Sequence, residues 1–333
     1  MPTDMSPDYV TARPLAPLAG LAALDPRRWF AGPELFLIAL IAATGAVALI
    51  LSVLFAQAVA WNAFLISFAP SAGLILLGAY VRSAKNMPRA AVCAIATGIY
   101  IGFSGVITIL IYLRFPITVP LLDADLMRLD AQIFGYDWQG FTTAIAAYPV
   151  IGRAIGWVYG SSLMQLFAVI FMLGYLGRSV ALYRVLITGT VSLLLAVAFW
   201  WLWPSLGPSA YVTLPAETER ALGLIHGQEA GARLRDMAQN GNAVITPQII
   251  MGTIAFPSYH TVMACLAVCF VAGTVIFWPM LLINIAMLPA ILSHGGHHFS
   301  DVLGGLLTFA LAYGFARLMV PEKSAPPDPG ATF

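Results

Sequence analysis

One short stretch near the end of the chain, SHGGHHFSDVLGG at residues 293–305, gathers three of the five histidines. His297 and Asp301 are four residues apart, so in a helix they share a face. A carboxylate placed there can accept the proton of one imidazole nitrogen, which leaves the other nitrogen as a nucleophile. Gly295 and Gly296 allow the chain to turn and a substrate to approach the backbone closely. The stretch therefore predicts a histidine nucleophile oriented by an acid.

A second polar motif, AFPSYHTVMA, contains His260. A histidine on another helix can approach the same reacting group as a proton donor. Pro257 and Ser258 stand where a helix would begin, and the free N–H groups of a helix N-terminus, together with the Ser258 hydroxyl, suit a phosphate. We therefore expect His260, His297 and Asp301 to form one catalytic site, with Ser258 and Gly296 contacting the phosphate.

The sequence around these motifs is that of a membrane protein. Hydrophobic residues make up 60% of the chain and charged residues 9%, whereas soluble domains carry roughly a quarter charged residues. The net charge of +1 gives no indication of a nucleic-acid partner. Apolar runs of ~20 residues predict an all-α, polytopic transmembrane helix bundle of about eight spans. The expected spans are residues 34–56, 62–81, 90–113, 152–176, 185–203, 259–277, 279–296 and 302–320.

The positions of Lys and Arg predict the orientation of these spans. With an even number of spans, four groups of basic residues fall on one side, which the positive-inside rule assigns to the cytoplasm. These groups are Arg13, Arg27 and Arg28; Arg82, Lys85 and Arg89; Arg178 and Arg184; and Arg317 with Lys323. The outer side then holds the long connections 114–151 and 204–258 and the three predicted catalytic side chains. We expect a multi-pass protein of the cytoplasmic (inner) membrane whose site faces the periplasm.

Four further polar positions have structural interpretations. The leucines of LLDADLMRLDAQIF recur at helical spacing with acids between them, which predicts an amphipathic helix on the membrane surface, with Asp123 and Asp125 as surface acids. Gln165, inside the fourth span, is expected to face the bundle, where it lines a cavity or bonds another helix. His226 stands alone in an outer loop and suggests no chemistry.

The two histidine motifs together resemble those of a known family. PSYH at residues 257–260, followed by GGHHFSDVLGG, is similar to the type-2 phosphatidic acid phosphatase superfamily, which carries P-S-x-H and a later H-x-x-x-D, each at the outer end of a helix. Within it the chain resembles the inositol phosphorylceramide synthase-like branch of phosphotransferases, which has a bulky residue, here Tyr259, in place of the glycine of PSGH. YGSSLMQL, WPSLGP and IAFPSYH also fit that branch.

The resemblance implies a division of the chain. Residues 90–320 would form a six-helix phosphatase or phosphotransferase core with its outer loops, and residues 34–89 would add two transmembrane helices. Residues 1–33 would be a cytoplasmic N-terminal segment, and the Pro-rich tail 321–333 is expected to be cytoplasmic and disordered.

The resemblance also implies roles for the site residues. His297 would attack phosphorus and form a phosphohistidine, Asp301 would orient it, and His260 would protonate the leaving group, with no metal and no cofactor. The substrate would be a phospholipid or lipid phosphate, and a polyol such as inositol is a possible acceptor. The chain would then be a lipid phosphotransferase, and a lipid phosphate phosphatase is the alternative, since the two differ only in whether a hydroxyl or water attacks the intermediate.

The chain departs from the superfamily pattern in its cations. Ala290 and Ile291 occupy the positions of the usual Ser-Arg pair, and no Lys-x6-Arg-Pro motif precedes PSYH. A transferring phosphate needs cationic stabilisation, for which the outer loop offers Arg235, Arg233 and Arg220. We favour Arg235, with Arg233 second, against the alternative that they are solvated charges balancing nearby acids.

Two other functions are weighed against this one. A transporter is expected to show broken helices and charges at the membrane midplane, whereas the spans here look continuous and the polar cluster lies at one interface. A zinc or haem site would have to use the clustered histidines, but the adjacent His297 and His298 point apart in a helix. Neither alternative is favoured, and His294 and His298 are taken as supporting groups.

The predicted orientation can be tested in intact cells. A cysteine introduced near position 225, in the outer connection 204–258, is expected to react with a membrane-impermeant thiol reagent, because that connection faces outward. Labelling that appears only after lysis would contradict the topology.

Overall fold

The computed structural model describes residues 29–322 and is all-α, as the sequence predicts. Within that range the chain forms thirteen α-helices, three single turns of other helix types, and one isolated bridge between Val59 and Ile245. The predicted segments 1–33 and 321–333 lie outside the described residues, apart from the few positions that border them. The helices are α2 (Gly32–Leu54), α3 (Trp61–Lys85), α4 (Pro88–Tyr112), α5 (Asp123–Leu129), α6 (Trp138–Ala146), α7 (Pro149–Gly160), α8 (Ser162–Tyr175), α9 (Ser179–Leu202), α10 (Ala216–Leu222), α11 (Gln228–Asn240), α12 (Tyr259–Cys269), α13 (Phe277–His294) and α14 (Phe299–Met319).

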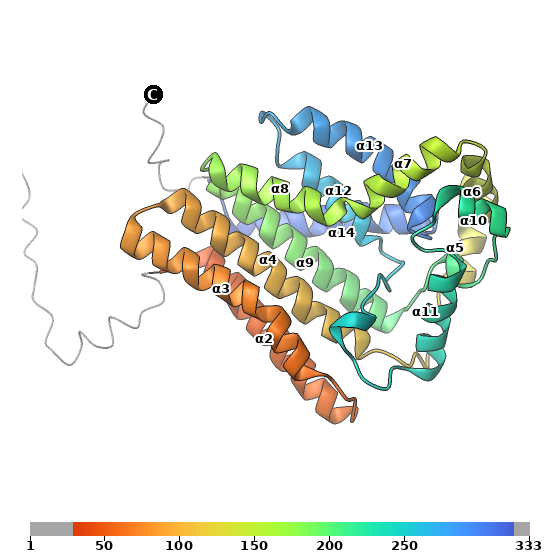
Figure 1. The fold of residues 1–333 in the computed structure, drawn as a ribbon, viewed down its shortest axis with the longest axis horizontal. Helices are drawn as coiled ribbons and strands as arrows, with labels where there is room; N and C mark the ends of the chain where they lie inside the picture. The colour runs from red at the N-terminus through yellow and green to blue at the C-terminus, as the bar shows by residue number, and fades with distance from the viewer. Residues whose placement is uncertain (1–28, 323–333) are drawn as a thin grey trace, which may run out of the picture.

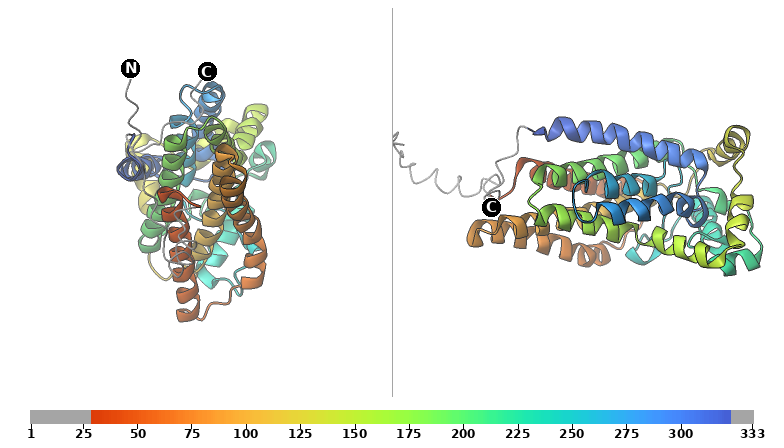
Figure 2. Two further views of the ribbon diagram at one scale, coloured as in Figure 1. Left: turned by 90° about the vertical axis from the view of Figure 1, so that its left-hand side faces the viewer. Right: turned by 90° about the horizontal axis from the view of Figure 1, so that it is seen from above.

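The long helices are those of a polytopic membrane protein. Six of them (α2, α3, α4, α9, α13 and α14) are long and apolar enough to cross a bilayer, and the bent pair α7 and α8 makes a seventh candidate. They run side by side along the long axis of the molecule (Figures 1 and 2). The expected helical bundle is thus confirmed.

Of the eight expected spans, six are single long helices, a seventh is the bent pair α7 and α8, and one is a shorter helix than its hydropathy indicates. The expected span 259–277 contains only the 11-residue helix α12, which at 1.5 Å per residue is about 16 Å long. Its chain then turns at Gly273, where φ is +71°, and the Arg178 guanidinium donates to the carbonyl groups of Ala272 and Gly273. The turn therefore lies beside the connection between α8 and α9, so the chain still reverses direction between α12 and α13.

The expected continuous span 152–176 is broken. Helices α7 and α8 meet at Ser161 with a bend of 51°, and the Gln165 side chain donates to the Ser161 hydroxyl at 2.9 Å. Gln165 also accepts a hydrogen bond from Asn284 of α13 at 2.8 Å, so it bonds another helix. The bend corrects the expectation that all spans are continuous.

The two long connections gather at one end of the bundle (Figure 1). One holds α5 and α6, between α4 and α7, and the other holds α10 and α11, between α9 and α12. Helix α12 begins at this end, and the turn from α13 to α14 lies there too. Both histidine motifs are therefore brought to the same end, as the topology predicts.

Helices α3 and α4 approach each other through small residues. A Cβ atom added to Gly98 of α4 would lie 2.7 Å from the Ser71 carbonyl oxygen of α3, and the Ser71 hydroxyl donates to the Gly98 carbonyl at 2.7 Å. Small residues at such crossings allow close backbone packing in membranes.

This packing predicts different effects for two glycines. Gly98→Ala pushes α3 and α4 apart, and overpacking of this kind costs ~1–3 kcal/mol, so the thermal stability of the detergent-purified protein should fall. Gly73→Ala is the matched control, because nothing lies within 4 Å of the added methyl group. Equal melting temperatures for the two variants would contradict the close α3–α4 contact.

Candidate active site

His297 and Asp301 form a buried hydrogen-bonded pair. The His297 Nδ1 and Asp301 Oδ2 atoms are 2.9 Å apart, and the two side chains are 4% and 0% exposed. Because a carboxylate can only accept, Nδ1 carries the proton and Nε2 keeps its lone pair. That Nε2 lies 3.5 Å from the Ser258 hydroxyl oxygen. His297 precedes α14 instead of lying within it, so the predicted contact is made across the first turn of the helix.

Asp301 also joins the two sequence motifs. Its carboxylate accepts the backbone N–H of His298 at 2.9 Å, and its carbonyl oxygen accepts the N–H of Ser258 at 3.0 Å. Ser258 caps α12 by accepting the N–H of Thr261. The first turn of α12 is thereby held against the start of α14.

His260 faces this pair from the first turn of α12. Its ring centroid lies 6.2 Å from that of His297. Tyr159 stacks on the His260 ring at 4.1 Å, and the tyrosine hydroxyl is 3.2 Å from His260 Nδ1. The bend between α7 and α8 follows directly after Tyr159, at Gly160 and Ser161. The fourth span thus contributes an aromatic support for His260 that the sequence did not reveal.

The two histidines have partners of different chemistry. The Asp301 carboxylate holds a proton on His297 Nδ1 in every step in which it stays ionised. A tyrosine hydroxyl both donates and accepts, so Tyr159 can serve neutral His260 as a donor and protonated His260 as an acceptor. The arrangement suits a nucleophile with a fixed tautomer opposite a proton carrier that changes state.

A second buried acid, Asp130, caps α14. Its carboxylate accepts the backbone N–H groups of Phe299, at 2.5 Å, and Ser300, at 3.0 Å, as well as the Ser300 hydroxyl. Carboxylates at a helix N-terminus are favourable because they satisfy unpaired N–H groups and interact with the helix dipole. Asp130 and Asp301 together anchor the turn that carries His297.

A third acid, Asp123, organises the connection after α9. Its carboxylate accepts the backbone N–H groups of Leu206, at 3.0 Å, and Gly207, at 2.7 Å, and lies 3.3 Å from His298 Nε2. The side chain is 2% exposed, so the expectation that Asp123 is a surface acid is wrong. The buried face of this segment consists of Asp123, Leu126 and Asp130, and Ile133 is exposed. Asp123 and Asp130 therefore face the protein, whereas Asp125 is exposed; the leucine spacing could not indicate the contacts of the two buried acids.

The segment that Asp123 holds packs directly on the histidine turn. Gly207 has a φ of +88°, and a Cβ atom there would lie 2.3 Å from the Gly296 carbonyl oxygen. Gly296 has a φ of +59° and faces Ser209. Gly296 is thus required by the close approach of two protein segments, in addition to the turn that the sequence predicts.

The remaining histidines surround the same turn. His294 is buried, and its Nε2 lies 2.9 Å from the Gly152 carbonyl oxygen. For His298, burial lowers the pKa, but the stronger combined effect of Asp301, Asp123 and Asp130 raises it. His226 packs edge-on against Tyr159 with ring centroids 6.1 Å apart, and burial followed by the proximity of His297 lowers its pKa to about 4. The placement of His226 beside the other histidines was not predicted.

The predicted cations lie on or near α11. Arg235 donates to the Ala210 carbonyl, and Arg233 donates to the Ile249 carbonyl at 3.0 Å. Among the contacts of the described residues, neither guanidinium reaches His260 or His297. Arg82, at the other end, is paired with the buried Glu34 at 2.6 Å. The described residues include no group of three or more His, Cys, Asp or Glu side chains arranged to hold a metal ion.

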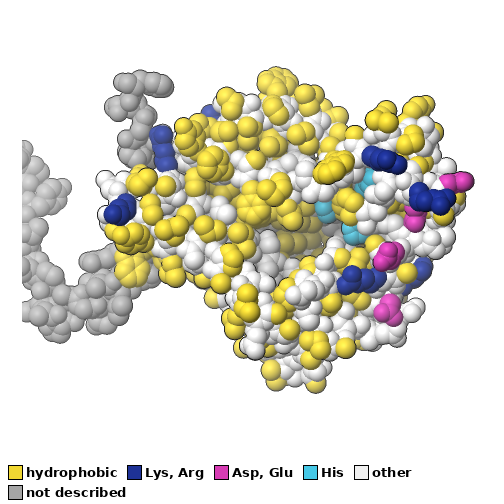
Figure 3. Space-filling view, in the orientation of Figure 1, with side chains coloured by type: hydrophobic (Ala, Val, Ile, Leu, Met, Phe, Trp, Pro, Cys, Tyr) yellow, Lys and Arg dark blue, Asp and Glu magenta, His cyan; other side chains and the backbone are white. Residues whose placement is uncertain are grey.

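Two hollows adjoin the segment that carries His226. One, of about 590 Å³, is lined mainly by apolar groups and includes Trp157 and Met164. The other, of about 410 Å³, includes Arg220, Arg233 and Glu229. Gly223 and Ile225 line both. Figure 3 shows histidine side chains on the wall of a hollow on this face, with acidic and basic side chains towards the same end of the molecule.

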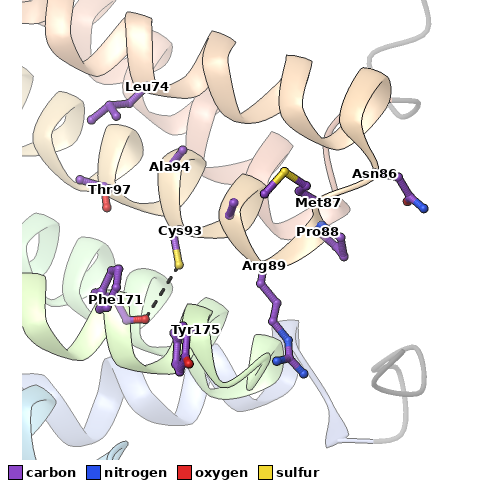
Figure 4. A pocket seen from close by; sticks show the side chains of 11 residues that line it. Leu74, Asn86, Met87, Pro88, Arg89, Cys93, Ala94, Thr97, Phe171 and Tyr175 are labelled. Carbon is purple, nitrogen blue, oxygen red and sulfur yellow. Dashed lines mark hydrogen bonds between the residues drawn. The ribbon is translucent and has the colours of Figure 1, made fainter. Parts of the chain in front are cut away.

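A larger hollow lies at the opposite end, between the α3–α4 turn and α8 (Figure 4). Its volume is about 1230 Å³. Its lining includes Phe171, Cys93 and Ala94, together with Arg89 and Tyr175. The lining residues that the structure describes include neither a histidine nor an acid, so size alone does not identify the chemical site.

The fold and the site define a helical membrane enzyme with a histidine–aspartate pair and a second histidine at one end of the bundle. Residues 124–315 match the family model of the PAP2 superfamily, and this match covers more than half of the chain. The chain belongs to the PAP2 superfamily, whose enzymes are phosphatases and phosphotransferases. No curated protein and no solved structure matches the chain significantly.

The network around Asp123 predicts a distant effect on this site. In Asp123→Asn, an amide NH2 group must face the N–H groups of Leu206 or Gly207, and the loss of hydrogen bonds to a charged group costs ~1.5–3 kcal/mol. We expect a lower melting temperature and a loss of activity. Asp125→Asn is the matched control, since Asp125 is exposed and its carboxylate pairs with the exposed Arg128, a contact worth at most ~1 kcal/mol. A fully active and stable Asp123→Asn variant would contradict the positioning role of the segment.

Proposed function

We propose that this enzyme is a lipid phosphotransferase that works through a phosphohistidine on His297. The observation that carries the proposal is the geometry of His297, whose Nδ1 is held by Asp301 while Nε2 faces the start of α12. His260 stands across the same space. Such an arrangement supports in-line displacement at phosphorus, with a nucleophile on one side and a proton donor available to the leaving oxygen.

In the first half-reaction, His297 Nε2 forms a bond to phosphorus as the bond from phosphorus to the leaving oxygen breaks. Protonated His260 gives its proton to that oxygen, and Tyr159 then holds the neutral ring in place. Positive charge develops on the His297 ring, and the buried Asp301 carboxylate stabilises it. This stabilisation is strong because the pair is shielded from water.

In the second half-reaction, a hydroxyl group or water attacks the same phosphorus and restores His297. Transfer to a hydroxyl group is the reaction we favour, because Tyr259 and the segments YGSSLMQL and WPSLGP resemble the inositol phosphorylceramide synthase-like branch. In that reading a phosphoryl headgroup moves between a phospholipid and a lipid or a polyol such as inositol. Hydrolysis of a lipid phosphate is the second candidate, since the residues around His297 serve either acceptor.

Backbone groups supply part of the phosphate site. Within the described residues, the N–H groups of Tyr259 and His260 at the start of α12 and those of Gly296 and His297 have no hydrogen-bond acceptor. N–H groups at a helix start and in a turn with positive φ bind anions well. These amides, with the Ser258 hydroxyl, are proposed to hold the phosphoryl oxygens in place of the missing Ser-Arg pair. Arg235, and Arg233 after it, are proposed to reach the bound headgroup from α11.

The proposed placement puts the site at the outer side of the inner membrane. The basic residues Arg82, Lys85, Arg89 and Arg178 flank helix ends opposite the histidines, which supports a cytoplasmic assignment for that end. Lipid substrates would then reach His297 at headgroup depth from the outer leaflet. We propose residues 90–320 as the catalytic core and α2 and α3 as an addition to it.

The roles proposed for His297, Asp301 and His260 predict different losses of activity when each residue is replaced. His297→Ala removes the covalent route and should leave background activity. Asp301→Asn and His260→Ala should each lower the activity on the order of 10²–10⁴-fold. His260→Ala should be least harmful on an aryl phosphate, whose leaving group needs little protonation, and His297→Ala should be equally inactive on alkyl and aryl phosphates.

Initial rates on matched alkyl and aryl phosphates measure this difference, with melting temperatures confirming that each variant is folded. If His260→Ala and His297→Ala lose the same activity on both substrates, the assignment of donor and nucleophile is wrong. Products of labelled phospholipids with and without inositol separate transfer from hydrolysis.

A further inference from the structure

His226 is a third histidine of the catalytic end and has no role in the steps above. It belongs to the segment between α10 and α11, and its backbone N–H donates to the His294 carbonyl at 3.0 Å. Its ring contacts Tyr159 edge-on. A Cβ atom on Gly296 would lie 3.4 Å from the His226 Cβ. Tyr159 and Gly296 therefore place this side chain beside both His260 and His297.

The ring of His226 is unlike the other four. The structure describes all five histidines, and His260, His294, His297 and His298 each have a side-chain hydrogen-bond partner. Among the described residues the His226 ring nitrogens have none, yet they are absent from the buried polar atoms that lack a partner. They are therefore not fully enclosed by the protein, so a substrate group could meet them.

The segment around His226 separates two environments. The apolar hollow with Trp157 lies on one side, and the hollow lined by Arg220, Arg233 and Glu229 lies on the other. A polar acceptor that enters the site and a proton that leaves it are both better solvated in the charged hollow than in the apolar one. Ile225 and Gly227, the neighbours of His226 in the chain, line the charged hollow, and His226 itself packs beside Gly296, so it lies between that hollow and the histidine turn.

We infer that His226 is a further catalytic residue, which removes the proton from the attacking hydroxyl group or water in the second half-reaction. The inference rests on the proposed function. In that step the attacking oxygen forms a bond to phosphorus while the bond from phosphorus to His297 Nε2 breaks, and its electron pair returns to Nε2. The proton of the hydroxyl group moves to a ring nitrogen of His226 and then to solvent through the charged hollow.

The surroundings of His226 support this role. Burial and the proximity of His297 hold its pKa at about 4, so the ring is neutral near pH 7 and has a nitrogen able to accept a proton. Once His297 carries a phosphoryl group, the negative charge nearby favours protonation of His226. The base thus becomes stronger in the intermediate that needs it. His260, stacked on Tyr159, remains assigned to the leaving group.

The test compares the two half-reactions in variants of His226. His226→Phe keeps an aromatic ring against Tyr159 and removes both nitrogens. Val244→Ala serves as the matched control, because it changes an exposed side chain of the same connection 204–258 that lines neither hollow. The purified full-length variants are mixed in micelles with ³²P-labelled phosphatidic acid or phosphatidylinositol, quenched in alkali, and assayed for labelled protein and for released product over time.

His226→Phe should form the labelled protein within a few-fold of the wild-type rate and should break it down ~10²–10⁴-fold more slowly. The phosphoprotein should therefore accumulate, as it should not in Val244→Ala. Wild-type breakdown in His226→Phe, or equal slowing of both half-reactions, would overturn the inference and leave the proposed function intact. Absence of both phosphoprotein and product from the wild-type enzyme would instead contradict the proposed function.

Discussion

The rest of the site depends on the hydrogen bonds of the buried residue Asp301. Its carboxylate binds His297 Nδ1 and the His298 N–H, and its carbonyl oxygen binds the Ser258 N–H that begins α12. One residue therefore sets the tautomer of the proposed nucleophile and holds the two motifs together. A carboxylate shielded from water is costly unless each partner is well placed. The precise turn between α13 and α14 follows from that requirement.

The two long connections, which hold α5 and α6 and α10 and α11, support this turn. Asp130 caps α14 from one connection, and Asp123 reaches the segment 204–210 of the other, which in turn packs on Gly296. The bend after Tyr159 brings a third segment to His260. The membrane helices set the depth at which the motifs meet, and the connections determine the positions of their side chains. Substitutions far from phosphorus are therefore expected to act through the histidine turn.

The sequence predicted those features that depend on local patterns. Hydropathy identified the bundle, and the four-residue spacing identified the contact between His297 and Asp301. The placement of His260 at the same end of the bundle as His297 followed from counting the reversals of the chain. The roles of Asp123, Asp130 and His226 were missed because they depend on contacts between segments far apart in the sequence. The short α12 was missed because an apolar composition does not reveal a turn such as that at Gly273, which Arg178 holds.

The central claim is that Asp301 directs His297 to react through Nε2. The most direct measurement is the position of the phosphorus on the ring, obtained by ¹H–³¹P NMR of enzyme trapped with substrate and denatured in alkali, where phosphohistidine survives. The account predicts phosphorus on Nε2 of His297. Phosphorus on Nδ1 of His297, or on either nitrogen of His260, would contradict it, because the first requires the bond to Asp301 to be broken and the second reverses the roles of the two histidines.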